Sequence, residues 1–311
     1  MKLQSLIEQY ISYRQSLGEQ QKSNGRTLRA FGRFIGAKAK LTDVRSEQVS
    51  TFLAGTGPIT LTWHLKLNVL RVFYEYAIGR GYAVATPLPV IIRKRPPAFI
   101  PYIYSIAELR RLLQTAKSHR RRGLDIRPDT LHTMILTLYG TGLRIQELID
   151  LNRMDVNFAD STITVRHGKF GKTRLVPFGP QLHRVLQEYV KKHPASSPEK
   201  PLLVTCHGIR VKTVSFQYDY RILCELAGIR RTDGARYQPR IHDLRHTFAV
   251  HRLTSWYRQG ADVQKLLPLL SVYLGHVNIQ ATQVYLSMTP ELLAEANHRF
   301  EQYTAKESRH D

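Results

Sequence analysis

A proline-rich, basic break divides this chain and constrains its fold more than any other feature. Residues 86–102 hold five of the fifteen prolines. Proline has no backbone donor and pushes the residue before it out of the helical region, so an extended connection is expected here. We therefore predict a first domain over residues 1–83, a linker over 84–103 and a second domain over 104–311.

Apolar residues recur at helical spacing four times in the predicted first domain. The runs lie near residues 3–17, 28–35, 46–53 and 63–78, and Ser46 is placed to cap the third of them. Each run has one apolar face, which must be buried against another helix. The first domain is predicted to be a small four-helix bundle.

The predicted second domain is mainly helical, with one hairpin. Ser105 and Glu108 form a capping-box pattern before an apolar run, and Thr289 followed by proline is a start signal for a last helix. Alternating residues predict strands over 162–166 and 173–177, joined by a turn over 167–171. Further helices are expected over residues 131–139, 180–192, 213–227, 242–256 and 262–273, and in a short stretch ending near 285. The fold class is predicted to be mainly α with a small antiparallel β-sheet, that is, α+β.

The charge of the chain is strongly unbalanced. Lysine plus arginine total 46 against 24 acidic residues, which gives a formal net charge of +22 and a sequence pI near 10.2. Such an excess attracts polyanions, so a nucleic acid or an acidic membrane surface is the expected partner. The competing interpretation, that the charge serves only solubility, is less favoured.

Cysteine usage and hydropathy indicate the compartment. Cys206 and Cys224 are the two cysteines, no CxxC pair is present, and two reduced, mostly buried thiols are expected. The first residues lack the apolar stretch of a signal peptide, and no apolar run approaches membrane-spanning length. We expect a cytoplasmic protein with no membrane partner.

One tyrosine follows an ordered set of basic motifs. Residues 140–148 read Gly-Thr-Gly-Leu-Arg-Ile-Gln-Glu-Leu, residues 242–246 read His-Asp-Leu-Arg-His, and Leu-Gly-His at 274–276 is followed by Tyr285. Tyrosine is a poor nucleophile until cations stabilise its phenolate and the transition state. Arginine gives a permanently charged, bidentate contact to phosphate. The set therefore suits attack of a phenol on a phosphodiester.

Spacing places several of these residues on shared helix faces. Arg144 follows the break at 140–142, where the start of a helix would point it outward, and Glu147 lies three residues on, close enough to orient it. His242 and Arg245 are also three apart and face the same way on one helix. Arg144 and Arg245 are thus the candidates for phosphate contact.

A metal site is the alternative interpretation of the histidines. His242 and His246 are spaced to put two imidazoles on one helical face, and His251 follows. No HExxH motif or acidic cluster accompanies them, so a metal-dependent nuclease is disfavoured. Each residue taken alone is a weak signal, because a single arginine is usually solvated and a single tyrosine usually packs. The ordered set on a basic chain carries the argument.

As a combination, these motifs resemble the signature of the tyrosine recombinases, also called the phage integrase or Xer-like family. The order Arg, Lys, His-x-x-Arg, His, Tyr is the order of that family, and the resemblance extends over nearly the whole chain. It implies an N-terminal helical, SAM-like core-binding domain followed by a catalytic domain. It also implies a site-specific recombinase that cleaves and rejoins DNA, encoded by a mobile element or serving chromosome resolution.

The resemblance also implies a role for each matching residue. Arg144 and Arg245 would hold the scissile phosphate, and Lys169 would be the general acid, with Lys172 as a competitor. The remaining roles are proton transfer by His242, donation to the phosphate by His276, second-shell orientation by Glu147, and formation of a covalent 3′-phosphotyrosine by Tyr285. The bond energy is conserved in that intermediate, so no metal, ATP or other cofactor is required.

The expected partner is double-stranded DNA. Basic residues of the linker and of the hairpin are candidate DNA contacts: Arg93, Lys94, Arg95, Lys172 and Arg174. The resemblance implies a homotetramer on two duplexes and a monomer or weak oligomer without DNA, and leaves open whether the helix after Tyr285 packs in cis or on a neighbouring subunit. A DNA-binding accessory protein without cleavage activity and a type IB topoisomerase-like enzyme are the alternatives.

Overall fold

The chain forms two compact units, Met1–Phe99 and Ile100–Asp311. The division falls inside the predicted linker, while the predicted domain limits at residues 83 and 104 stay a prediction. The computed structural model describes eight stretches of the chain, and the residues between them are left out of the description. The stretches are 2–56, 60–95, 100–119, 125–166, 173–235, 237–276, 278–288 and 292–297.

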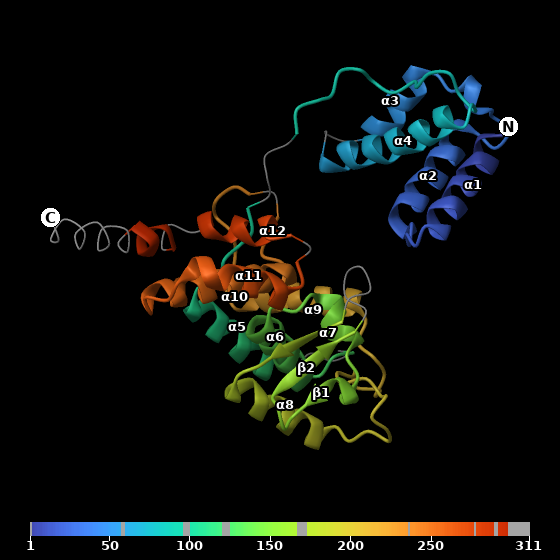
Figure 1. The fold of residues 1–311 in the computed structure, drawn as a ribbon. Coiled ribbons are helices and arrows are strands. Elements are labelled where there is room, and N and C mark those ends of the chain that lie inside the picture. Colours follow the sequence, from blue (N-terminus) through green and yellow to red (C-terminus); the bar gives the residue numbers. More distant parts are fainter. Residues whose placement is uncertain are drawn as a thin grey trace, which may run out of the picture. The chain divides into compact units, whose positions relative to one another are not determined.

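The first unit is the predicted four-helix bundle (Figure 1). Its apolar faces meet in one core that is rich in aromatic rings, including Phe31 and Phe73 with no exposed surface. The third helix begins one residue earlier than predicted, because Arg45 occupies the cap position and Ser46 is the first helical residue. The elements are α1 (Leu3–Ser16), α2 (Lys22–Ile35), the 3-10 turn η1 (Leu41–Asp43), α3 (Ser46–Ala54) and α4 (Leu61–Gly79).

The second unit carries the remaining elements, and the mainly helical α+β prediction is confirmed. The capping box at Ser105 and Glu108 is present, with the serine hydroxyl accepting from the backbone of Glu108. The elements are α5 (Ile106–Ser118), α6 (Pro128–Thr141), α7 (Ile145–Asp150), η2 (Arg153–Asp155), β1 (Val156–Asn157), β2 (Thr162–Val165), β3 (Arg174–Pro177), α8 (Pro180–Lys192), α9 (Thr213–Leu226), α10 (Ile241–Arg258), α11 (Val263–Leu274), α12 (Gln280–Gln283) and η4 (Val284–Ser287).

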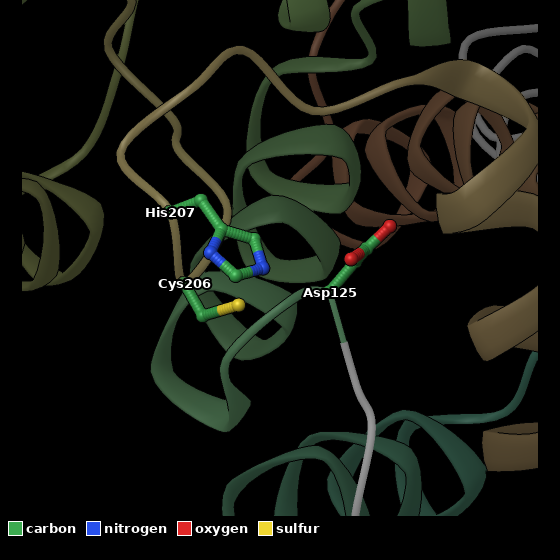
Figure 2. Close-up of side chains that lie close together, drawn as sticks. All are labelled: Asp125, Cys206 and His207. Carbon is green, nitrogen blue, oxygen red and sulfur yellow. The ribbon is translucent and has the colours of Figure 1, made fainter.

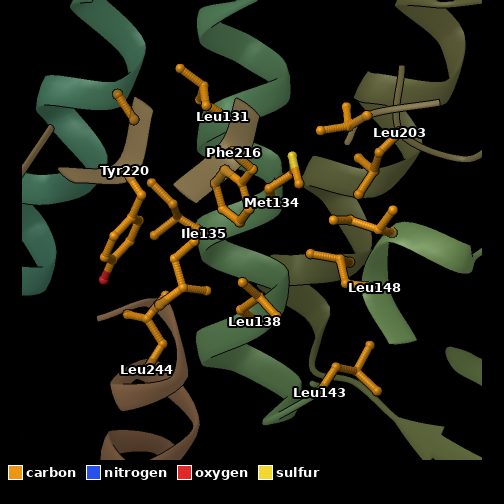
Figure 3. Packing of buried hydrophobic residues seen from close by; sticks show 14 of the residues in the cluster. Leu131, Met134, Ile135, Leu138, Leu143, Leu148, Leu203, Phe216, Tyr220 and Leu244 are labelled. Carbon is orange, nitrogen blue, oxygen red and sulfur yellow. The ribbon is translucent and has the colours of Figure 1, made fainter. Parts of the chain in front are cut away.

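Helix α6 is the centre of this unit. It packs against α5, α8 and α10, and apolar side chains approach it from several sides (Figure 3). Leu131, Met134 and Ile135 are fully buried on α6, in one cluster with Phe216 of α9 and Leu244 of α10. Complete burial of one such side chain contributes about 1.5–3 kcal/mol. The helix ends at Thr141 with Gly142 as its C-cap, and the candidate site is built around that end.

The predicted hairpin forms two strands of a three-stranded antiparallel sheet, in the order β1-β2-β3. Val165 pairs with Arg174, which sets the register of the hairpin. The two-residue strand β1 was not predicted, because two residues give no periodic pattern. The turn with Lys169 and Lys172 lies outside the described residues.

The chain beyond η4 contacts its own unit. Residues 292–297 are helical, Leu292 is fully buried beside α10 and α11, and Glu295 pairs with Arg258 at 2.8 Å. The predicted start signal at Thr289 lies outside the described residues. Among the described residues, no helix is long and apolar enough to cross a membrane.

Candidate active site

Two helix C-termini supply main-chain carbonyls to the site. Gly142 follows α6 with a φ of +62°, and Gly275 follows α11 with a φ of +66°. The last carbonyls of a helix have no partner within it and form the negative end of its dipole. A Cβ on Gly142 would lie 2.6 Å from a ring carbon of Phe248, and one on Gly275 would lie 2.9 Å from the Arg174 guanidinium. Both positions therefore require glycine.

Arg245 lies on α10 and is only 2% exposed. Its Nη1 donates to the carbonyl of Gly142 and its Nη2 to that of Leu274, each at 2.6 Å. Neither acceptor carries a formal charge. Burial, and next the charge of Arg144, lower the pKa of Arg245 to about 10, so the guanidinium keeps its proton at neutral pH. An uncompensated cation is thus buried at the meeting point of two helix ends.

Arg144, Glu147 and Arg174 form an ion-paired group, the Glu147 cluster. Arg144 caps α7, and its Nη1 donates to Glu147 Oε1 at 2.8 Å, as the sequence spacing suggested. Arg174 donates to both oxygens of the same carboxylate, at 3.0 and 2.8 Å. A further bond of 3.0 Å from Arg144 to the Gly275 carbonyl ties the cluster to the end of α11.

The carboxylate of the Glu147 cluster is ionised over the whole physiological range. Burial alone would raise the pKa of Glu147, but hydrogen bonds and charge from Arg174 and Arg144 lower it to about 2. The side chain of Glu147 is 7% exposed and that of Arg174 is 12% exposed. Two cations against one anion leave this cluster with one net positive charge.

Tyr285, on η4, is the centre of a second group. We call this the Tyr285 cluster (His242, Arg245, His246, His276 and Tyr285). The tyrosine is 2% exposed. The ring of His246 lies 5.5 Å from it and 4.9 Å from the ring of His242, so His246 is in ring contact with both. The ring of His276 is stacked on Tyr285 at 6.1 Å.

Thr282 is hydrogen-bonded to the ring of His276. The threonine is fully buried on α12, and its Oγ1 lies 2.7 Å from Nδ1 of His276. When the hydroxyl donates to Nδ1, the proton of the neutral ring resides on Nε2. In that tautomer, Thr282 leaves the Nε2 donor of His276 on the far side of the ring.

The imidazoles are uncharged at neutral pH. Burial, and next the positive charge nearby, lower the pKa of His246 and of His276 to about 4. His242 lies in the same field but keeps an exposed face. Burial raises the pKa of Tyr285, opposed by the charge of Arg245 and a hydrogen bond from it. The phenol is therefore protonated in the free chain, and its proton must move before it can attack.

The structure brings together most of the catalytic residues chosen from the sequence. Arg144, Glu147 and the Tyr285 cluster share one site, while Lys169 and Lys172 lie outside the described residues. Arg174, chosen as a DNA contact, is engaged with Glu147 inside the site, and its contact with DNA stays a prediction. Arg93, Lys94 and Arg95 are exposed, as a DNA-contacting linker requires.

Sequence reasoning gave no catalytic role to His246 or Thr282. His246 was considered only as a metal ligand, although its position four residues after His242 puts both on one face of α10. Within the described residues no third side chain of the metal-binding types completes a close set with this pair. His251 turns instead to the hydroxyl of Tyr139, 3.0 Å away. Thr282 carried no signal beyond lying three residues before Tyr285.

The model of the phage integrase family matches residues 105–291, which is more than half of the chain. The chain belongs to this family. An integrase/recombinase of Sinorhizobium fredii, y4rB, is 32% identical over 95% of the chain and 96% of its own length. The tyrosine recombinase XerC of Pelobacter propionicus is 29% identical over 94% of the chain and 95% of its own length.

Solved structures agree on the fold. The Tn1549 transposon integrase, determined with a circular intermediate DNA, superposes with a TM-score of 0.73 at 17% identity, covering 97% of the chain and 99% of that protein. A lambda integrase dimer bound to a core site gives a TM-score of 0.67 at 16% identity, covering 93% of the chain and 78% of that protein. The predictions of a tyrosine recombinase, of a DNA strand-breaking and rejoining enzyme, and of its two-part fold are confirmed.

Proposed function

We propose that this site-specific recombinase cleaves double-stranded DNA with Tyr285 and forms a covalent 3′-phosphotyrosine. The observation that carries the proposal is the setting of the phenol: it is 2% exposed, bonded by the buried cation Arg245, and flanked by the imidazoles of His246 and His276. A packing tyrosine needs none of these neighbours. A nucleophile that acts on a phosphodiester is activated by a neighbouring base and by cations that stabilise the developing charge.

In the proposed cleavage step, Tyr285 Oη attacks the scissile phosphorus and the bond from phosphorus to the 5′ oxygen breaks. The phenol proton passes to the imidazole pair His246 and His242, of which His246 is the nearer ring. Both rings are neutral at pH 7, because burial lowers the pKa of each to about 4, and a neutral imidazole accepts a proton. The departing 5′ oxygen takes a proton and leaves as a free hydroxyl, with Lys169 as the proposed donor.

The phosphate is held in this proposal by groups that are already oriented. Arg245 is fixed by two carbonyls and Arg144 by a carboxylate and a carbonyl, so neither has to reorganise when charge develops. Nε2 of His276 adds a neutral donor, set by Thr282. Rejoining reverses the step: a 5′-hydroxyl attacks the phosphotyrosine and Tyr285 recovers its proton. No metal or nucleotide enters this balance.

DNA as the partner is supported by the net charge of +22 and by the solved relatives, which include integrases bound to DNA. We propose that the exposed Arg93, Lys94 and Arg95 contact the phosphate backbone. Affinity should then fall with salt, and replacing the three by glutamine should reduce the log–log slope by about 0.9 for each phosphate that is no longer neutralised.

The remaining proposals concern the biological setting. Relatives include integrase/recombinases and a transposon integrase, which supports origin in a mobile element. Assembly as a homotetramer on two duplexes and a cytoplasmic location stay predictions. In the described chain, residues 292–297 pack on their own unit through Leu292 and Glu295, so assembly in trans would require these contacts to be exchanged.

The decisive experiment is covalent capture. Duplexes bound by the full chain are first selected from a randomised library, and the selected site is then made with a nick near the cleaved bond. Wild type should form an SDS-resistant adduct that retains a 5′ label of the cleaved strand and is insensitive to excess EDTA. Tyr285→Phe should bind the same DNA and form none. The exposed Tyr218→Phe serves as the matched control and should form it normally.

An adduct of equal yield with Tyr285→Phe would refute the nucleophile assignment. Tight binding by wild type without any adduct would favour the accessory-protein alternative. Relaxation of a supercoiled plasmid that lacks the selected site would favour the topoisomerase-like alternative.

A further inference from the structure

A second group of reactive side chains lies at the opposite end of α6 from the candidate active site. Asp125, Cys206 and His207 approach one another so that one ligand atom of each lies within 4.8 Å of the other two (Figure 2). Asp125 precedes the first turn of α6, whereas Gly142 follows its last turn. The fourteen residues of α6 rise about 1.5 Å each, which puts the two groups roughly 20 Å apart.

The main chain holds the two contributing segments together. The backbone N–H of Cys206 donates to the carbonyl of Asp125 at 2.8 Å, and a guanidinium N–H of Arg127 donates to the carbonyl of Cys206 at 3.3 Å. Two residues that are far apart in sequence are therefore fixed side by side before any ligand arrives. Their side chains then start from neighbouring backbone positions.

Cys206 and His207 belong to a closed turn. The backbone N–H of Thr205 donates to the carbonyl of Ile209 at 2.8 Å, and that of Gly208 donates to the carbonyl of Thr205 at 3.1 Å, with Gly208 at a φ of +72°. The turn presents a thiol and an imidazole from consecutive residues. Figure 2 shows the Cys206 sulfur and the His207 ring on the side of the turn where the Asp125 carboxylate lies.

The chemistry of the three side chains selects an ion. A thiolate, an imidazole and a carboxylate are the three side-chain types that bind Zn²⁺, and three protein ligands leave the fourth tetrahedral position for water. Magnesium and calcium prefer oxygen donors alone, so a sulfur and a nitrogen ligand disfavour both. We propose that Asp125, Cys206 and His207 form a binding site for a zinc-type divalent cation.

The geometry requires only small movements. Ligand atoms of one tetrahedral zinc lie about 3.4–3.7 Å apart, given bonds of about 2.0–2.3 Å. The separations of up to 4.8 Å must therefore shorten by about 1 Å. Asp125 and His207 are exposed and Cys206 is half-buried, so rotation of the side chains is not blocked and the open position faces water.

The proposed ion would act on structure and not on DNA cleavage. It would link the segment entering α6 to the 205–209 turn, and binding to the folded chain alone raises stability by mass action. Because α6 is the central helix of its unit, fixing its entry affects the element on which the recombination site is built. The proposal is independent of the assignment of Tyr285, and its test uses no DNA.

The experiment uses the full chain without an affinity tag, with thiols kept reduced and metals removed by chelator. Co²⁺ is titrated as the probe, because a bound thiolate gives an intense ultraviolet charge-transfer band and tetrahedral cobalt gives strong visible bands. We expect one Co²⁺ per chain, displaced by Zn²⁺. Cys206→Ser should abolish the charge-transfer band, and His207→Gln and Asp125→Asn should each weaken binding at least tenfold. Cys224→Ser, which changes the other, buried thiol, should leave the titration unaltered.

Thermal unfolding provides the second readout. Zn²⁺ should raise the Tm of wild type and of Cys224→Ser, and should leave the Tm of Cys206→Ser unchanged. A variant that keeps the wild-type circular dichroism without metal has not lost its fold, so its failure to bind is informative. The proposal is overturned if wild type binds no cobalt at micromolar concentrations, or if Cys206→Ser retains the charge-transfer band. Equal binding by wild type and all three variants would place the ion elsewhere, and would equally overturn it.

Discussion

The two halves of the candidate active site hold their arginines by different means. In the Glu147 cluster, two guanidiniums share one carboxylate, which satisfies their donors and cancels part of their charge. In the Tyr285 cluster, Arg245 is bonded to carbonyls of two helix ends and is surrounded by neutral imidazoles. The first arrangement favours rigidity. The second preserves a full positive charge beside the phenol, where the proposed reaction places the phosphate.

The difference is built from backbone conformation. A helix end offers partial negative charge without an acid, and it can do so to a guanidinium only if nothing blocks the approach. Gly142 and Gly275 remove the Cβ at both ends, and Phe248 and Arg174 occupy the space that a Cβ would need. The Gly-Thr-Gly and Leu-Gly-His motifs therefore serve the arginines as well as the turns.

The substitution Glu147→Gln should destabilise the chain most. Removing one partner of a buried ion pair leaves uncompensated charge, here two guanidiniums, and costs about 3–5 kcal/mol. The free energy of unfolding from urea titration should fall by that amount. Asp150→Asn, an exposed carboxylate on the same helix, should change it by less than about 0.5 kcal/mol. An equally small loss with Glu147→Gln would mean that the cluster is not held by its carboxylate.

Arg245→Lys tests the other half. An ammonium keeps the charge but cannot span two carbonyls in the planar fork of a guanidinium, so the charge is no longer fixed beside Tyr285. The rate of adduct formation on the nicked duplex should fall about 10²–10³-fold, the usual cost of one oriented donor. DNA affinity should change little, because the net charge is conserved. Wild-type cleavage by this variant would show that charge suffices without geometry.

The two clusters should lose their contributions to stability at different pH values. His246 and His276 have folded-state pKa values near 4, below their ordinary value of 6.5, so the unfolded chain binds more protons between these limits. Stability is then full above about pH 6.5 and falls towards pH 4, by roughly 1–2 kcal/mol after allowance for partial exposure. Glu147 behaves differently: its pKa of about 2 keeps its contribution intact above about pH 4.5, and it is lost only as pH falls towards 2.

The measurement is urea unfolding from pH 7 to pH 4.5. The pH slope should become shallower in His246→Phe, which removes one of the two imidazoles and leaves His276, and should keep its wild-type value in Glu147→Gln. His183→Phe serves as the control for a histidine outside the site. If the slope in His246→Phe equals that of wild type, the acid sensitivity arises elsewhere in the chain.

The sequence predicted the helices and the order of the candidate catalytic residues, because both depend on residues that are close together in the chain. Periodicity places α8 at its observed limits, and spacing alone puts Glu147 beside Arg144. Arg174 is a different case. Its place in the alternating pattern of β3 predicts a side chain that faces solvent. The side chain instead bonds to Glu147, 27 residues away in the sequence, because β3 passes beside the end of α11. Contacts made by tertiary packing leave no local pattern.

The contact of Thr282 with His276 could not be predicted from the sequence for the same reason. Substitution of Thr282 should have the smallest effect of those considered. Within the Tyr285 cluster it is the hydroxyl that sets the ring of His276, through a contact of 2.7 Å. Thr282→Val keeps the shape and removes that bond, whose net contribution is about 0.5–1.5 kcal/mol. His276 would then sample both tautomers, and adduct formation should slow by up to about tenfold. Thr282→Ser retains the hydroxyl and should recover most of the rate, while the pH at half-maximal rate stays as in wild type. If serine fails to restore the rate that valine removes, Thr282 acts through packing at the end of α12, and the donor of His276 is oriented by the protein around it.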